Sequence, residues 1–434
     1  MKKIRDGYKM TELGEIPSEW DVRTINDLIK ENIIIDVMDG NHGEIHPKAS
    51  DYVDIGIPFI MANNLKNGKL DIENCKFISY EQAKSLRKGF AREGDVLLTH
   101  KGTLGETAIV PKLNDEYIML TPQVTYYRVS DNNILINRYL KVYFDSKKYQ
   151  DKLKSFGSQS TRDYVGITEQ RKLSIVLPTI EEQEKIALIL STVDGQIDNV
   201  DALIEKNKEL KKGLMQTLLT KGIGHTKFKK TEIGEIPDEW EVKSLDDFNI
   251  SNSYGPRFSS DLYDECGNCK VIRGTDVIRN GKVQYKGIPY ANIDNQILET
   301  HKLIKNDFVV VTTADCGMSF VFNDNGTYMP SAYMVRIRFN DNINPYFVNK
   351  FFETKVIRRQ VEQHIRKGTI ANLPGSDLLK FKIYVPSLLE QEKIVSILSE
   401  VDKKIEEYEN KKQKLEELKK GLMQQLLTGK IRVN

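Results

Sequence analysis

The strongest constraint on this chain is that it contains two copies of the same sequence segments. Residues 8–20 (YKMTELGEIPSEW) and 228–240 (FKKTEIGEIPDEW) are identical at nine of 13 positions and contain both tryptophans of the chain. A second pair, residues 178–220 and 386–428, is identical at 24 of 43 positions. A repeat period near 210 residues is too long for a solenoid, so these matches predict a duplicated pair of domains.

The repeats enclose two segments, residues 30–177 (the first module) and 250–385 (the second module), which match each other only faintly. REGDVLLTHKGTLGETAIV at residues 92–110 parallels IKNDFVVVTTADCGMSFVF at residues 304–322. The order is thus variable, constant, variable, constant, with a short constant opener before each module. Two divergent modules on two similar frames suggest one mechanical role performed twice, with two different specificities.

The constant segments after each module predict long amphipathic helices. Residues 182–219 contain no proline, and apolar side chains recur every three or four positions there, as they do in the second copy. A helix of about 38 residues with a single apolar stripe does not fold alone, so we expect the two copies to pair as an antiparallel coiled coil with a pseudo-two-fold axis. The seam positions are Ile186, Leu190, Val193, Ile197, Val200, Ile204, Leu210, Leu214 and Leu218, and Ile394, Leu398, Val401, Ile405, Tyr408, Leu415, Leu418, Leu422 and Leu426.

The modules themselves predict a mixed α/β fold. Strand-like runs such as VLLT (96–99) and FVVVTT (308–313) are bounded by Gly, Asn, Asp or Pro, and each module ends in a helix, near residues 137–155 and 344–366. The predicted fold class is therefore α/β (α+β), with two modules linked by long antiparallel helices. The expected domains are residues 1–180 (opener and first module), 181–221 (first long helix), 222–388 (second opener and module) and 389–434 (second long helix).

Catalytic and metal-binding motifs are scarce in this sequence. No phosphate-binding G-x-x-x-x-G-K-[ST] loop occurs, and neither the F-x-G-x-G turn nor the Asn-Pro-Pro-aromatic motif of methyltransferases is present. Cys266 and Cys269 form one C-x-x-C pair, which His301 and Cys316 could complete as a zinc site, although a simple turn is the alternative. We therefore expect no catalytic residues and no metal site, and a stand-alone enzyme is disfavoured.

Polar turns in both modules fit nucleic-acid binding better. Arg, Lys, Asn and Gln side chains can bind base edges through paired hydrogen bonds, and Ser, Thr and Lys also bind phosphates. For any one of these turns, ordinary solvated surface is the alternative. The predicted DNA-binding residues are Asn63, Asn64, Lys66, Thr99, His100, Lys101, Thr103, Ser158, Gln159, Thr161 and Arg162 in the first module, and Arg257, Arg273, Thr275, Arg279, Thr312, Thr313, Arg366, Lys367 and Thr369 in the second.

The hexapeptide KKGLMQ is identical in both long helices. One interpretation is helix-end packing, with lysines complementing the helix dipole. The other is a symmetric docking surface for a partner that binds twice, and both can hold together. The residues concerned are Lys211, Lys212, Met215 and Gln216, and Lys419, Lys420, Met423 and Gln424.

Together these features resemble the specificity subunits of type I restriction–modification systems. The resemblance covers essentially the whole chain, through the GEIP-x-EW openers, the EQEKI helix starts and the strand and turn from Gly94 to Gly105. It implies two target recognition domains, each binding half of a bipartite DNA site, with the coiled coil setting the spacer between the halves. The second module departs from the pattern, because Ala314 stands where the first has Gly102.

The resemblance also implies partners. Two methyltransferase (modification) subunits would dock on the conserved helices, and restriction-translocase subunits would complete the assembly. S-adenosylmethionine, ATP and Mg would be bound by those partners, and no cofactor by this chain. This division of labour agrees with the missing catalytic motifs.

Composition leaves one alternative function open. A net charge of +2 neither requires nor excludes a nucleic-acid partner, so a coiled-coil adaptor that binds proteins without specific DNA binding is the competing hypothesis. Four cysteines and the absence of a secretory signal predict a cytoplasmic protein, and no apolar run reaches the roughly 18 residues of a membrane span.

Overall fold

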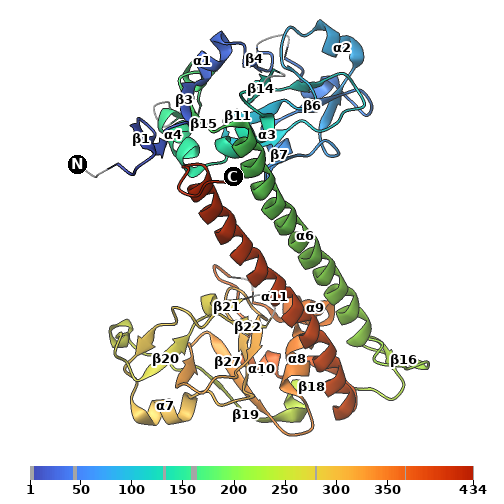
Figure 1. The fold of residues 1–434 in the computed structure, drawn as a ribbon. Helices are drawn as coiled ribbons and strands as arrows, with labels where there is room; N and C mark the ends of the chain where they lie inside the picture. Colours follow the sequence, from blue (N-terminus) through green and yellow to red (C-terminus); the bar gives the residue numbers. More distant parts are fainter. Residues whose placement is uncertain are drawn as a thin grey trace. The chain divides into compact units, whose positions relative to one another are not determined.

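The computed structural model describes residues 4–42, 46–130, 133–157, 164–278, 281–366 and 368–433 (Figure 1). The chain divides into two compact units, residues 1–200 with 411–434 (the first unit) and residues 201–410 (the second unit). Each unit holds one opener, one module and parts of both long helices. These helices are α6 (Ile180–Leu218) and α11 (Leu388–Leu426), with 39 residues each.

The first module is built on two sheets. An antiparallel sheet has the strand order β12-β11-β14-β4, and a five-stranded sheet has the order β10-β13-β6-β9-β5 with one parallel pair, β13 with β6. The strands of this module are β4 (Ile34–Asp39), β5 (Tyr52–Val53), β6 (Ile57–Ile60), β7 (Leu65–Lys66), β8 (Lys69–Leu70), β9 (Lys76–Ile78), β10 (Phe90–Ala91), β11 (Val96–Lys101), β12 (Thr103–Ile109), β13 (Ile118–Leu120) and β14 (Val124–Val129). Its helices are α2 (Tyr80–Ser85), α3 (Asn137–Phe144), α4 (Lys147–Gly157) and α5 (Ile167–Gln170).

The opener of the first unit is locked to the start of α6. Its hairpin pairs β1 (Tyr8–Thr11) with β2 (Gly14–Pro17), and β3 (Asp21–Thr24), which precedes α1 (Ile25–Lys30), pairs with β15 (Ser174–Leu177). Trp20 is fully buried, and its indole N–H donates to Glu182 at 2.6 Å. The repeated tryptophan is therefore a structural anchor for the long helix.

The second unit repeats this plan. Its four-stranded sheet has the order β19-β27-β24-β25, and a three-stranded sheet has the order β23-β20-β26. Trp240 donates to Glu390 at 3.1 Å, as Trp20 does to Glu182. The strands are β16 (Phe228–Thr231), β17 (Gly234–Pro237), β18 (Glu241–Ser244), β19 (Asn249–Tyr254), β20 (Cys269–Ile272), β21 (Val277–Ile278), β22 (Lys282–Val283), β23 (Tyr290–Ala291), β24 (Phe308–Val311), β25 (Ser319–Val321), β26 (Tyr328–Pro330), β27 (Met334–Phe339) and β28 (Lys382–Val385), and the helices are α7 (Asn295–His301), α8 (Pro345–Phe352), α9 (Lys355–His364) and α10 (Gly375–Leu378).

Within each unit, the start of one long helix packs against the end of the other. In the first unit, Ile186 and Leu190 share the main core with Leu426, and in the second, Ile394 and Leu398 share it with Leu218. The helices are therefore antiparallel within each unit. Both cores extend under the four-stranded sheets, so each module rests on the helix pair.

The predicted fold class, mixed α/β with long helices, is confirmed. Two details of the prediction are corrected. The helix expected at each module's end is two helices, because the chain turns after α3 and after α8. Leu210 and Leu418, which were expected on the buried seam, are each half exposed.

Candidate nucleic-acid interface

The turn between β11 and β12 is shaped by two glycines with left-handed backbone, Gly102 (φ 80°) and Gly105 (φ 94°). Strand β12 bulges at this point, since Gly105 and Glu106 together lie opposite Thr99 of β11. The Thr99 hydroxyl oxygen accepts the backbone N–H of Glu106 at 2.9 Å. Because a bulge turns side chains away from the regular alternation, it fixes the direction in which Glu106 leaves the strand.

The end of β11 also contacts the segment around Tyr164. The Val165 N–H donates to the carbonyl of His100 at 3.0 Å, and the His100 ring nitrogen Nδ1 lies 3.0 Å from the carbonyl of Val165. Lys101 and Tyr164 form a β-bridge. The structure thus brings the predicted residues of this turn next to the segment that follows Arg162. The predicted residues Ser158, Gln159, Thr161 and Arg162 lie outside the described residues.

The second module has the same arrangement. The Leu373 N–H donates to the carbonyl of Thr312 at 2.8 Å, and Asn372 forms β-bridges with both Thr313 and Arg366. The predicted residues of the β24–β25 turn and of the 366–369 segment are therefore close together. Arg279 and Lys367 lie outside the described residues.

Ala314 replaces a glycine of the first turn without leaving the left-handed region. Ala314 has φ 63°, the same left-handed region as Gly102 in the first module. An L-residue in this region is disfavoured by about 1–2 kcal/mol, so the surrounding packing imposes the conformation.

Four of the predicted DNA-binding side chains are buried, which corrects the prediction for Asn64, Thr99, His100 and Thr312. The Asn64 amide oxygen accepts a backbone N–H three residues earlier, and the Thr312 hydroxyl donates to the carbonyl of Tyr333. Burial lowers the pKa of His100, which keeps the imidazole neutral. These side chains hold the turns in place and are not offered to a ligand.

Three exposed residues of the prediction do lie together. Asn63, Lys66 and Thr103 line one surface depression of about 300 Å³, together with Ala62, Leu65, Asn67 and Glu106. They come from the hairpin β7–β8 and from the start of β12. Two separate stretches of the sequence, residues 62–67 and 103–106, therefore form one surface.

The second module presents a different set of side chains. Arg257, Thr275, Arg366 and Thr369 are exposed. Arg273 is fixed by Asp276, whose carboxylate accepts from the guanidinium at 2.8 and 3.0 Å.

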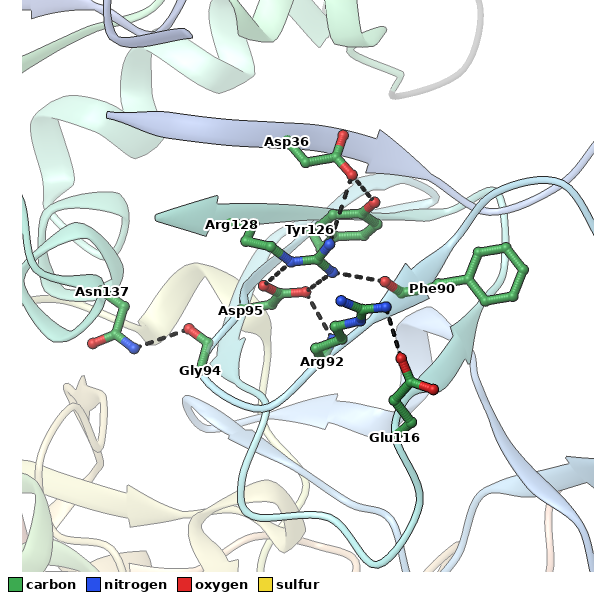
Figure 2. A network of polar contacts seen from close by, with 9 residues as sticks. All are labelled: Asp36, Phe90, Arg92, Gly94, Asp95, Glu116, Tyr126, Arg128 and Asn137. Carbon is green, nitrogen blue, oxygen red and sulfur yellow. Dashed lines mark hydrogen bonds and ion pairs between the residues drawn. The ribbon is translucent and has the colours of Figure 1, made fainter. Parts of the chain in front are cut away.

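An ion pair braces the start of β11, at the opposite end of the strand from the first turn (Figure 2). Arg128 donates to both carboxylate oxygens of Asp95, at 2.7 and 3.0 Å, and to the carbonyl of Phe90. Burial raises the pKa of Asp95, and Arg128 acts against that rise. In the second module, Arg338 makes the same contacts to Asp307. Each module thus contains an internal ion pair, and none of the predicted surface residues takes part in it.

One lysine of each module contacts a long helix. Lys69, at the hairpin β7–β8, pairs with Asp198 of α6 at 2.5 Å, and Lys282, at the hairpin β21–β22, pairs with Glu406 of α11 at 2.6 Å. The two acidic positions are equivalent in the helix repeat. These lysines were not among the predicted site residues.

Known proteins were compared with this chain. The family model for the type I restriction modification DNA specificity domain matches residues 17–211 and 237–417. This chain belongs to that family. Type I restriction enzyme MjaVIII specificity subunit from Methanocaldococcus jannaschii is 28% identical, over 99% of this chain and 96% of its own length.

More distant members are also similar to this specificity subunit. Type I restriction enzyme EcoKI specificity subunit from Escherichia coli is 19% identical, over 88% of this chain and 82% of its own length. The crystal structure of a type I S subunit from M. genitalium has the same fold, with a TM-score of 0.58 and 14% identity over 98% of this chain and 97% of its own.

The KKGLMQ hexapeptides of this specificity subunit are only partly available for docking. Lys211 is buried and pairs with Asp402 at 2.8 Å and Glu353 at 3.4 Å, which corrects its assignment as a docking residue. Lys419 pairs with Asp194 at 2.6 Å. Met215 and Met423 are partly buried and pack against the two cores. Four exposed residues remain, namely Lys212, Gln216, Lys420 and Gln424.

The described residues contain no group of three or more His, Cys, Asp or Glu side chains that could hold a metal ion. Cys266 is exposed and Cys269 is buried, and burial raises the pKa of Cys269 to about 11. Among the helices of the described ranges, none is both long and apolar enough to cross a membrane.

Sequence reasoning missed two kinds of surface residue. Glu106 lines the depression but is acidic, and the prediction looked for donors. Gln123 and Tyr333 are exposed, and their carbonyls accept the N–H groups of His100 and Thr312 at 2.9 Å. Gly105, directly before Glu106, is the sequence signal that could have indicated a bulge at this position.

Proposed function

We propose that this specificity subunit binds duplex DNA through its two modules, each contacting one half of a bipartite, asymmetric site. The observation that carries the proposal is the pairing of equivalent turns with different exposed side chains. Gly102 and Ala314 are both left-handed, as are Gly105 and Gly317, yet Thr103 and Glu106 of the first turn are replaced by Asp315 and the partly buried Met318 in the second. Equivalent frames with different surface chemistry suit two different half-sites.

The long helices would set the spacer between the two half-sites and would dock partners. Helix pairs are stiff, whereas sequence is bound by side chains on turns, so separation and sequence would be determined by different parts of the chain. The exposed Lys212, Gln216, Lys420 and Gln424 occur on both helices, which suits a partner that binds twice. We assign that role to two methyltransferase subunits, with restriction-translocase subunits completing the complex.

Catalysis would belong to these partners. The modification subunits would bind S-adenosylmethionine for adenine methylation, and the restriction subunits would use ATP and Mg for cleavage. This chain would contribute recognition and spacing, and would bind none of these cofactors.

The deciding experiment is single-molecule mapping of N6-methyladenine in the source cell, with and without this chain. We expect deletion to remove one gapped, two-part motif, which would reveal both half-sites at once. An unchanged methylome would contradict the proposal.

The competing function is a protein adaptor that does not bind DNA specifically. The two hypotheses differ in salt dependence, because contacts to phosphates release counterions and weaken steeply with salt. We expect the full chain with its methyltransferase partner to bind its gapped target specifically, with an affinity that falls as salt rises. Equal affinity for unrelated duplexes would favour the adaptor.

A further inference from the structure

The depression on the first module contains a carboxylate that the local backbone is built to present. Glu106 lies in the β12 bulge, and its backbone N–H is held by Thr99. The neighbouring Gly105 has φ 94°, and a Cβ atom there would come within 2.1 Å of a side-chain oxygen of Gln150. The left-handed backbone favours glycine at that position, so the bulge sets the direction of Glu106.

The Glu106 carboxylate has no hydrogen-bond or ion-pair partner among the described residues, although the residue as a whole is partly buried. The side chains of Asn63, Lys66 and Thr103, which line the same depression, also have no such partner in the described part of the chain. The Glu106 carboxylate oxygens are not among the buried polar atoms without a partner, so they remain accessible and free to accept hydrogen bonds from a ligand in the depression.

The chemistry of the carboxylate restricts that ligand. A glutamate accepts hydrogen bonds and repels phosphate, so a surface that bound only the DNA backbone would be weakened by it. In the major groove, cytosine N4 and adenine N6 are the amino donors, whereas guanine and thymine present acceptors there. Asn63 and Lys66 can bind the neighbouring acceptor or a phosphate.

We propose that Glu106 is a specificity-determining residue of the first module, which accepts a hydrogen bond from the exocyclic amino group of a cytosine or adenine in the first half-site. The inference rests on the proposed function of the chain. It concerns only one half-site, because the equivalent Met318 of the second module packs against an apolar core and carries no acceptor of this kind.

The test compares Glu106→Gln with Glu93→Gln in the full chain, expressed with its partners in the source cell. Glutamine has nearly the same size and adds an amino donor, so we expect discrimination at one base pair of one half-site to fall about tenfold or to change base. The other half-site should stay the same. Glu93 is exposed in the turn before β11, outside the depression, and its variant should leave the whole motif unchanged.

Each outcome has a distinct meaning. If the wild-type chain specifies a gapped motif and Glu106→Gln leaves every position unaltered, the role of Glu106 is refuted while the proposed function stands. If the wild-type chain specifies no motif, the proposed function itself fails. If Glu106→Gln abolishes methylation, binding of the purified variant complex to duplexes changed at single base pairs decides the matter. Unchanged relative preferences in the first half-site overturn the proposal, and loss of one preference supports it.

Discussion

The two modules differ at their surfaces far more than in their internal supports. Asp95 and Arg128 of the first module and Asp307 and Arg338 of the second form the same buried ion pair, and each arginine also donates to a carbonyl before the supported strand. A buried charge left without its partner is strongly destabilising, so these pairs cannot diverge one residue at a time.

The exposed side chains on the same frame are under no such constraint. Gln123 of the first module and Tyr333 of the second have equivalent backbone hydrogen bonds, yet one side chain is an amide and the other an aromatic ring. The comparison teaches that the frame and the proposed binding chemistry can vary independently.

The largest expected effect comes from exchanging a whole module. Replacing residues 250–385 with the second module of another specificity subunit should change one half of the methylated motif and leave the other half and the spacer unchanged. The reason is that each module has its own sheets and core. Methylome mapping of the chimera measures the result, and a change in both halves would contradict independent modules.

A second prediction compares equivalent residues on the two long helices. Asp402 is mostly covered and pairs with the buried Lys211 and Lys350 at 2.8 and 2.6 Å, whereas the equivalent Asp194 pairs with Lys419 in a more exposed setting. Asp402→Asn should destabilise the second unit by about 3 kcal/mol, because it removes the nearest carboxylate from two buried lysines and leaves them only Glu353, at 3.4 and 3.7 Å. Asp194→Asn should cost about 1 kcal/mol or less.

Hydrogen exchange in α8 and at the start of α11 would measure the first effect, and exchange at the end of α11 the second. Equal losses would show that burial does not distinguish the two pairs.

The same network predicts a pH dependence. Burial works against the charged form of Asp402, but the two lysines hold its pKa below the ordinary value. Its contribution is therefore present above about pH 4 and is lost as the pH falls through the lowered pKa.

Sequence alone predicted the elements that repetition and periodicity make visible. The long helices followed from identical segments with apolar spacing, and the strands around residues 96–99 and 308–311 from short apolar runs bounded by turns. Pairing of the helix ends within each unit also followed, since one apolar stripe needs a partner.

The site was predicted less well because burial depends on contacts distant in sequence. Thr99 and His100 look like polar turn residues, but packing of Val165 against β11 covers them. The sequence suggests that Lys211 is a surface lysine, but in the fold it is paired with Asp402 and Glu353. No local sequence pattern reveals these contacts, so the prediction treated these polar residues as exposed.

A third prediction tests the internal brace of the first module. Arg128→Ala should destabilise the first unit by about 3 kcal/mol, because the almost fully buried Asp95 loses its partner. Arg92→Ala is the matched control, since its pair with Glu116 is exposed on both sides and is worth about 1 kcal/mol or less (Figure 2). Hydrogen exchange in β11 and β14 measures the difference, and similar protection in both variants would refute the brace.

The smallest effect separates turn conformation from turn sequence. Gly102 and Ala314 have φ values of 80° and 63°, so both turns need the left-handed region, and only the second holds it with a side chain. Ala314→Gly should therefore stabilise the second unit by up to about 1 kcal/mol, because the entropy of glycine partly offsets the relief of strain. Gly102→Ala should destabilise the first unit by about 1 kcal/mol. A Cβ atom at Gly102 would meet no atom within 4 Å, so the second change tests backbone strain without a clash. Urea unfolding followed by hydrogen exchange in each unit measures both. Opposite signs would establish that the two turns share one backbone requirement, and a neutral Gly102→Ala would show that the first turn can adopt another conformation.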